Sequence, residues 1–165
     1  MKFTIDRWES PMGTLLLVTD QEGVLRALEF GDLESRMHRL LTRYYPGYEL
    51  QAGPAPENLL RALQAYFGGK LDALKSVPVA MGGTEFQRKV WKGLQTIPVG
   101  TTSSYGQLAS QLGHPQASRA VGAANGANPI GIVVPCHRVI GANGSLTGYG
   151  GGMARKQWLL HHEAH

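Results

Sequence analysis

The sequence predicts an α+β fold in two parts: a small N-terminal α/β domain with an antiparallel sheet, and a mostly helical C-terminal domain with a helix-turn-helix. Short strand-like segments separated by turn residues fill the first part, whereas helical spacing of apolar residues dominates the second. Between them, a proline-interrupted extended stretch ends in two glycines, which is typical of a linker. We therefore expect a structural domain at residues 1–76, a linker at 77–83 and a second domain at 84–165.

The first domain is expected to be a sheet with two helices. Alternating or apolar segments between turn residues predict the strands. Apolar residues at helical spacing, ended by Pro-Gly or Gly-Gly, predict the helices. The expected strands are residues 2–8, 14–19, 24–30 and 48–51, and the expected helices are residues 33–44 and 57–67. The acidic residues of this part fall mostly in turns or on polar faces, so we interpret its role as architectural.

The second domain opens with helix signals. Thr84 and Gln87 have the spacing of a capping box, so a helix is expected to begin there and to end near Ile97-Pro98. A shorter helix capped by Ser103 or Ser104 runs to Gly113. After the turn His114-Pro115-Gln116, another helix is expected from Ala117 to Asn125 or Gly126. This order predicts a helix-turn-helix, although the spacing leaves an ordinary helical hairpin open.

The second helix of this pair has an unusual composition. Residues 117–126 are mostly Ala and Gly and carry one charge, Arg119, whereas proteins that read the major groove use several long polar side chains. A face of small residues lets the backbone approach another surface closely. If that surface is DNA, the narrow minor groove fits better, Arg119 is the intruding side chain, and sequence specificity is weak.

Composition and charge limit the classes of function that fit this sequence. The 165 residues are 42% hydrophobic and 17% charged, as in a folded globular protein. Residues 1–83 carry nine basic and ten acidic side chains, whereas residues 84–165 carry seven basic and two acidic ones. The basic half fits a nucleic-acid partner, or is simply a mildly basic half of a neutral domain.

The chain shows no signal-peptide pattern and no apolar run long enough to cross a membrane, so a cytoplasmic protein with no membrane partner is expected. The single cysteine excludes an internal disulfide and a cysteine-based zinc cluster. No metal site and no cofactor are predicted.

That cysteine is the strongest candidate for chemistry. The apolar run Ile130–Val134 predicts a short buried strand, and Pro135 ends it, so the chain is expected to turn at Cys136. A lone cysteine followed by His137 is a candidate nucleophile. The alternative is an inert buried cysteine, because free cysteines are among the most buried residues.

The last segments supply further candidates. A helix is expected over residues 153–162, with Trp158 and Leu159 as core anchors. Glu163 lies at its carboxyl end, where the helix dipole disfavours a carboxylate, so a partner is expected and His137 is the candidate. The glycine-rich stretch Leu146–Gly152 predicts either close backbone approach to a ligand or a mobile surface loop.

These residues together resemble the O6-alkylguanine-DNA alkyltransferase family, the methylated-DNA–protein-cysteine methyltransferases, and in particular its short bacterial members. The likeness is strong over residues 84–163 and weak before them, and it implies a ribonuclease H-like N-terminal domain. Its matching motifs are Tyr105, Ser118-Arg119-Ala120-Val121-Gly122, Asn128-Pro129, Pro135-Cys136-His137-Arg138-Val139, Tyr149 with the glycines after it, and Trp158-Leu159-Leu160-His161-His162-Glu163.

The resemblance implies roles for individual residues. Cys136 accepts the alkyl group, His137 takes the thiol proton through a water, Glu163 holds the imidazole, Asn128 braces the turn and Tyr105 hydrogen-bonds the flipped base. DNA contacts are implied for Tyr105, Gly106, His114, Ser118, Arg119, Ala120 and Gly122, and Arg119 fills the stack. The implied substrate pocket consists of Asn125, Gly131, Pro135, Val139, Tyr149, Gly150 and Lys156.

The implied function is the irreversible, single-turnover transfer of an alkyl group from O6-alkylguanine, and from O4-alkylthymine, in duplex DNA to Cys136. The damaged base is flipped out through the minor groove, the protein is inactivated, and it acts as a monomer, with cooperative assembly on DNA left open. Gly131 and Gly150 replace bulkier residues of some relatives, which predicts tolerance of adducts larger than methyl. A cysteine hydrolase and a non-catalytic DNA-binding module are the alternatives.

Overall fold

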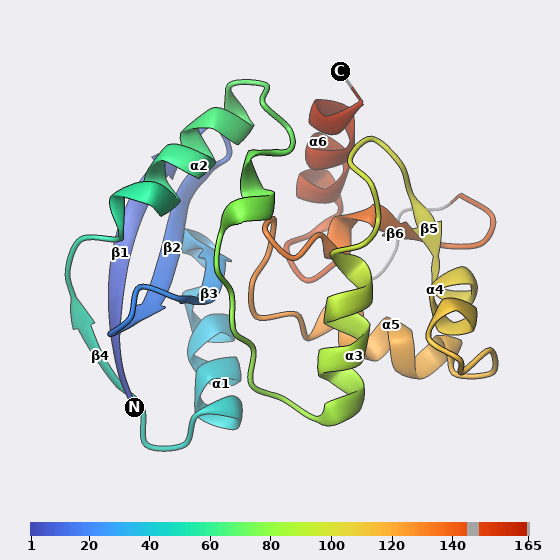
Figure 1. Ribbon diagram of the computed structural model, residues 1–165, viewed down its shortest axis with the longest axis horizontal. Helices are drawn as coiled ribbons and strands as arrows, with labels where there is room; N and C mark the ends of the chain where they lie inside the picture. Colours follow the sequence, from blue (N-terminus) through green and yellow to red (C-terminus); the bar gives the residue numbers. More distant parts are fainter. Residues whose placement is uncertain (145–148, 165) are drawn as a thin grey trace. The chain divides into compact units, whose positions relative to one another are not determined.

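The computed structural model describes residues 1–144 and 149–164 (Figure 1). Contacts divide the chain into two compact units, Met1–Gly82 with Pro129–Val133, and Gly83–Asn128 with Val134–His165. The segment at 129–133, which the sequence placed in the second domain, thus belongs to the first unit. Within the described ranges, no helix is long and apolar enough to cross a membrane. The predicted α+β class is confirmed.

The first unit is built on a four-stranded sheet in the order β3-β2-β1-β4. Its strands are β1 (Lys2–Ser10), β2 (Gly13–Asp20), β3 (Leu25–Phe30) and β4 (Glu49–Ala52). The three N-terminal strands are antiparallel, as predicted, but β4 pairs with β1 in parallel. The reason is that β3, helix α1 (Glu34–Tyr44) and β4 form a crossover, which brings the chain back in the direction of β1.

Two helices supply the core contacts of this sheet. The cluster on the α1 side consists of Phe3, Leu16, Val18, Ala27, Met37, Leu41 and Tyr45. Helix α2 (Glu57–Phe67) contacts the other face, because the Phe67 ring lies 5.9 Å from Trp8 and side chains alternate along β1. Each large apolar side chain buried in this way contributes about 1.5–3 kcal/mol. Short 3-10 turns complete the unit at Gly31–Leu33 and Ala73–Ser76.

The second unit is mostly helical, as predicted. Its elements are α3 (Glu85–Leu94), β5 (Ser103–Ser104), α4 (Tyr105–Gln111), α5 (Ser118–Gly126), the 3-10 turn η3 (Cys136–Arg138), β6 (Val139–Ile140) and α6 (Met153–Glu163). The capping box predicted at Thr84 is present, and Ser104 forms a second one with Gln107. Both boxes satisfy backbone N–H groups that have no partner within the helix, so they fix where α3 and α4 begin.

Helix α3 holds the helix pair α4–α5 in place. The indole Nε1 of Trp91 donates to the Ala124 carbonyl at 2.8 Å, which ties α3 to α5. At Gly93 a Cβ atom would lie 3.1 Å from side-chain atoms of Leu108 and Leu112, so glycine permits the close approach of α4. Helices α4 and α5 therefore both pack against α3, and residues 112–117 connect them.

The predicted strand over Ile130–Val134 is wrong. Ile130 makes an isolated bridge to Leu28, and the chain then turns through Ile132, whose φ is 69°. A positive φ is rare for a β-branched residue. Prolines at both ends of the segment remove ladder donors, and the Val133 N–H instead closes a tight turn onto the Gly131 carbonyl at 2.7 Å. The apolar run is buried as expected, but as a turn.

The expected anchoring of α6 is half right. Leu159 is fully buried, whereas Trp158 is 36% exposed and stacks on His162, one turn further along the helix, with ring centroids 5.0 Å apart. Of the predicted loop Leu146–Gly152, residues 146–148 lie outside the described residues. The remainder is a turn in which the Gly152 N–H donates to the Tyr149 carbonyl.

Candidate active site

Cys136 opens a tight 3-10 turn that is braced by two asparagines. Its N–H donates to the Val134 carbonyl at 2.8 Å, and its carbonyl accepts from Asn125 Nδ2 at 3.3 Å. Asn128 Nδ2 donates to the same Val134 carbonyl at 2.8 Å. Both asparagines are buried, and Cys136 itself is 4% exposed. Because these bonds hold the backbone on both sides of the cysteine, the position of the thiol is set by α5 and the residues that follow it.

The next residue, His137, forms a buried pair with Glu163. Nε2 of His137 lies 2.7 Å from Glu163 Oε2, and both side chains are almost completely buried. Among the described residues, no hydrogen-bond partner reaches His137 Nδ1. A carboxylate only accepts, so Nε2 carries the proton in the neutral ring and Nδ1 is left as the acceptor. The pair is thus arranged so that Nδ1 can take a proton from a nearby acid.

Arg138 is the member of this cluster that the sequence reasoning missed. Its guanidinium donates to both oxygens of Glu163, from Nε at 2.7 Å and from Nη2 at 3.1 Å, and to the Ile97 carbonyl at 2.8 Å. The sequence did contain a signal for this contact. A carboxylate at the carboxyl end of a helix needs a positively charged partner, which a neutral imidazole does not provide. Glu163 is therefore held between two neighbours, His137 and Arg138.

Burial controls the charge state of the histidine. Removal from water lowers the pKa of His137, and the bond to Glu163 only partly opposes this effect. The positive charges of Arg138 and Lys156 lower the pKa further. Lys156 is fully buried, and its ammonium donates to the Val139 carbonyl. Burial also lowers the pKa of Lys156. At neutral pH the histidine is therefore uncharged, within the same turn that carries the thiol.

This pKa shift predicts a loss of stability in mild acid. As the pH falls below about 6.5, the unfolded chain binds the His137 proton while the folded chain does not, so the free energy of unfolding decreases. Urea denaturation between about pH 5 and 7.5 measures the slope. In His137→Gln the part of the slope that comes from this group is expected to disappear, and equal slopes in the two proteins would contradict the assigned shift.

The residues with implied DNA contacts lie on α4 and α5. Ser118, Arg119 and Ala120 are exposed in the first turn of α5. Tyr105 and Gly106 begin α4, and the Tyr105 ring lies 3.8 Å from where a Cβ of Gly122 would be. The absence of that Cβ leaves room for the ring between the helices. The structure thus groups Tyr105 with the α5 face that carries Arg119.

His114 lies in the turn between these helices. Its Nε2 is 3.2 Å from the Lys89 ammonium, and its ring packs edge-on against Phe86 with centroids 5.8 Å apart. These contacts connect the turn to α3. His114 is exposed, so it is available to a partner of the helix pair.

The residues of the implied pocket do not all fall in one unit. Val139, Pro135 and Asn125 surround the Cys136 turn directly, and Tyr149 is buried and Gly150 half-buried in the segment before α6. Gly131 belongs to the first unit, where its N–H donates to the Leu28 carbonyl at 3.1 Å. Chain position and hydrogen bonding therefore place Asn125, Pro135, Val139 and Lys156 at the cysteine turn.

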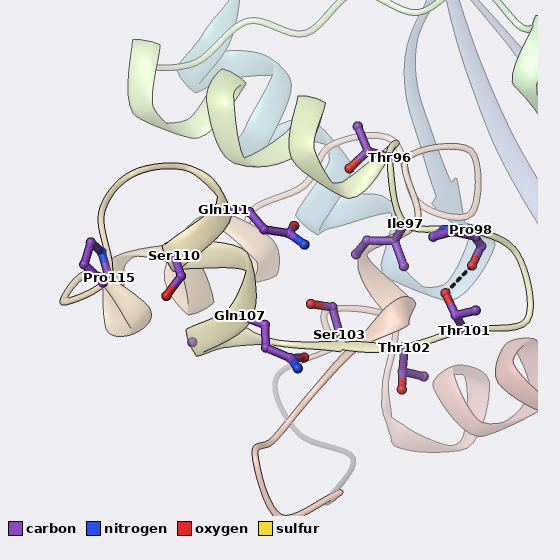
Figure 2. A pocket seen from close by; sticks show the side chains of 11 residues that line it. Thr96, Ile97, Pro98, Thr101, Thr102, Ser103, Gln107, Ser110, Gln111 and Pro115 are labelled. Carbon is purple, nitrogen blue, oxygen red and sulfur yellow. Dashed lines mark hydrogen bonds between the residues drawn. The ribbon is translucent and has the colours of Figure 1, made fainter.

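A cleft of about 720 Å³ with a mixed polar and apolar lining lies beside α4 and does not include the cysteine (Figure 2). At one end Thr101 Oγ1 donates to the Pro98 carbonyl at 2.7 Å (Figure 2). Its lining has hydroxyls and amides but no titratable side chain, so it holds no side-chain base that could activate one of these hydroxyls. The lining residues are Thr96, Ile97, Pro98, Thr101, Thr102, Ser103, Gly106, Gln107, Ser110, Gln111 and Pro115.

The fold and the cysteine turn define a class: a two-unit protein in which a buried cysteine directly precedes a histidine that is hydrogen-bonded to a buried carboxylate. Two family models match the chain. The ribonuclease-like domain of 6-O-methylguanine DNA methyltransferase matches residues 6–81, and its DNA-binding domain matches residues 85–165. The chain belongs to the methylated-DNA–protein-cysteine methyltransferase family.

Individual relatives match over nearly their whole length. The methylated-DNA–protein-cysteine methyltransferase of Shigella flexneri is 53% identical over 158 residues, covering 94% of this chain and 92% of the relative. A crystal structure of Mycobacterium tuberculosis OGT in complex with DNA has a TM-score of 0.80 and 44% identity, and covers 99% of this chain and 93% of that one. The O6-methylguanine-DNA methyltransferase of Pyrococcus kodakaraensis has a TM-score of 0.74 at 26% identity, and covers 99% of each chain.

Proposed function

We propose that this protein repairs alkylated duplex DNA by moving the alkyl group from guanine O6 to the sulfur of Cys136, once per molecule. The observation that carries this proposal is the buried His137–Glu163 pair directly beside the single cysteine of the chain. Family membership and the relative solved with DNA support the choice of DNA as partner.

The proposed chemistry needs a thiolate. A free thiol with a pKa near 8.5 is only a few per cent ionised at neutral pH, roughly. His137 Nδ1 accepts the thiol proton through a water, and Glu163 stabilises the resulting imidazolium. The sulfur then forms a bond to the alkyl carbon as the bond from that carbon to O6 breaks. The released guanine carries negative charge, which Tyr105 and the Gly150 N–H relieve by donating hydrogen bonds.

The sulfur is not regenerated in this scheme. The product is a thioether, which water does not readily hydrolyse, so one protein molecule repairs one lesion. A cysteine hydrolase would instead release its product and turn over, and a non-catalytic binding module would form no bond. No observation of the site favours either alternative over transfer.

Reaching O6 requires that the damaged base leave the stack, at a cost of about a few kcal/mol. We infer that α5 approaches the minor groove, because its exposed first turn is small apart from Arg119. Arg119 then fills the space left by the flipped base, with Tyr105 beside it. Such binding reads little sequence, since it makes few contacts to base edges.

Removing Arg119 is expected to slow repair in duplex DNA by about 10- to 100-fold, the kinetic equivalent of part of the unstacking cost. The same Arg119→Ala variant is expected to react normally with O6-benzylguanine as a free base, because nothing must be flipped. Single-turnover rates on both substrates measure the difference. Arg119→Lys separates charge from stacking, and equal slowing on both substrates would contradict the role in flipping.

Stoichiometry tests the proposed function. A duplex with one O6-methylguanine inside a restriction site becomes cleavable when guanine is restored. The number of restored sites is expected to rise to the number of protein molecules and then stop. Restoration of more sites than there are protein molecules would overturn the proposal. So would binding of the duplex with no site restored. Transfer from O4-alkylthymine and from adducts larger than methyl, monomeric action and cooperative assembly on DNA stay predictions.

A further inference from the structure

Helix α3 carries a row of basic side chains on the side that faces away from its core contacts. A helix turns by about 100° per residue, so Arg88, Lys89 and Lys92 fall within one arc of about 100°. All three are exposed, whereas Val90 and Leu94 on the opposite side are fully buried. We call the three basic side chains the α3 basic face. A row of this kind is either a solvated surface or a contact surface for an anionic partner.

Within the described residues, no carboxylate neutralises the α3 basic face. Arg88 donates to the Gly83 carbonyl at 3.3 Å, and none of the three basic side chains forms an ion pair there. The sequence gives residues 84–165 two acidic side chains, Glu85 and Glu163, and Glu163 is buried. Glu85 lies in the first turn of α3, where the positive end of the helix dipole stabilises a carboxylate. With three basic groups against one acidic group, this side of α3 keeps a net positive charge.

The α3 basic face continues onto the turn between α4 and α5 through His114. The Lys89 ammonium lies 3.2 Å from His114 Nε2, and edge-on packing against Phe86 orients the ring. An ammonium can only donate, so Nε2 accepts and the imidazole proton lies on Nδ1. Among the described residues neither Lys89 nor His114 has a second hydrogen-bond partner, so their remaining N–H groups are left for solvent or a ligand. Several donors beside a cationic centre match a phosphate, which offers several acceptor oxygens.

The position of this face in the second unit favours duplex DNA as the partner. Helix α3 packs against both α4 and α5, and Figure 1 shows it beside α5. His114 lies between these two helices, five residues before Arg119. The family model of the DNA-binding domain begins at Glu85, the first residue of α3. Through His114 the α3 basic face is therefore continuous with the helix pair whose exposed turn carries Arg119.

We propose that the α3 basic face, with His114 beside it, binds the phosphate backbone of duplex DNA next to the damaged nucleotide. Contacts of this kind carry no sequence information, but they hold the duplex in register for α5. The proposal rests on the proposed function, which supplies duplex DNA as the partner. An acidic protein surface would match the same charges. DNA binding that is unchanged by the substitutions below would favour such a partner and overturn the proposal.

The salt dependence of binding tests the proposal. The double variant Lys89→Met with Lys92→Met is compared with the control Lys70→Met with Lys75→Met, which removes two exposed lysines of the first unit and changes the net charge equally. Binding to an undamaged duplex is measured by fluorescence anisotropy between about 0.05 and 0.2 M salt. Each lost phosphate contact is expected to reduce the slope of log affinity against log salt by about 0.9 in magnitude.

The α3 double variant is therefore expected to lose about 1.8 from the magnitude of this slope, and about 10- to 30-fold in affinity at about 0.15 M salt. The control double variant is expected to keep the slope of the natural chain. All four substitutions are at exposed positions, so both proteins are expected to fold. An unchanged slope in the α3 double variant would overturn the proposal. An equal loss in both double variants would also overturn it, because net charge alone would then explain the binding.

Lysine acetylation probes the same surface in the natural chain, without a substitution. Duplex DNA is expected to protect Lys89 and Lys92 from an N-hydroxysuccinimide acetate reagent, because the phosphates cover their ammonium groups. Lys70 and Lys75 are expected to react equally with and without DNA, and peptide mass spectrometry measures all four. Unprotected α3 lysines in a chain that binds the duplex would overturn the proposal.

Neither measurement includes alkyl transfer, so the two proposals fail separately. Protection of the α3 lysines in a chain that transfers no alkyl group from O6-methylguanine would refute the proposed function alone. Transfer from the duplex by a chain whose α3 lysines stay unprotected would refute only the role of the α3 basic face.

Discussion

Glu163→Gln is expected to slow alkyl transfer to Cys136 by about 10²- to 10⁴-fold, the usual contribution of general acid–base catalysis. Glutamine can keep a hydrogen bond to His137 Nε2, which lies 2.7 Å from Glu163 Oε2, but it cannot stabilise the imidazolium that forms when Nδ1 takes the thiol proton. Single-turnover transfer from an O6-methylguanine duplex, measured against pH, gives the rate. The loss is expected to shrink as the pH rises, because the thiol then ionises without help.

The matched control for this variant is Glu85→Gln. Glu85 is the other carboxylate side chain of the second unit and is exposed in the first turn of α3. The transfer rate of Glu85→Gln is therefore expected to equal that of the natural chain. If Glu163→Gln transferred the alkyl group as fast as the natural chain, the proposed role of the His137–Glu163 pair would be contradicted. A pH-independent loss would indicate damage to the fold in place of lost proton transfer.

Arg138→Met is expected to lower the free energy of unfolding by about 3–5 kcal/mol, because it leaves a buried carboxylate without its main partner. The guanidinium donates to both Glu163 oxygens, and both side chains are buried. Urea or guanidinium denaturation measures the change. Arg61→Met removes the exposed Arg61–Glu57 pair on α2 and is expected to produce no measurable change, since exposed ion pairs contribute little.

The double variant Arg138→Met with Glu163→Gln is expected to recover most of that stability. It removes both charges of the pair, and replacing a buried ion pair as a whole costs far less than breaking it. Transfer by this double variant is expected to stay slow, because the histidine still lacks its carboxylate. If the loss of stability in the double variant equalled the sum of the losses in the two single variants, the pair would not act as a unit.

Local rules predicted much of this structure. The capping box at Thr84 fixed the start of α3, and the choice of Ser103 or Ser104 for α4 was settled by the second box at Ser104. Glu163 could be assigned a partner because a carboxylate at a helix carboxyl end opposes the dipole. These features depend on residues close in sequence or on a simple electrostatic conflict, so the sequence alone carries the information.

Other features depend on contacts that no local pattern encodes. The segment Ile130–Val134 is as apolar as a buried strand, but its flanking prolines and its single bridge to Leu28 leave it a turn. Trp158 has the residue type of a core anchor, yet the orientation of α6 leaves it 36% exposed. Arg138 was named only within a motif and was given no role of its own, because it donates its three hydrogen bonds to residues distant in the chain.

The most direct measurement is the intact mass of the protein after incubation with a duplex that carries O6-methylguanine. A gain of about 14 Da, localised to Cys136 by peptide mapping and limited to one per molecule, is the result expected for methyl transfer to sulfur. Cys136→Ser is expected to bind the same duplex and to show no gain. An unchanged mass in the natural chain with bound DNA, or an adduct on another residue, would contradict the assignment of Cys136 as the acceptor.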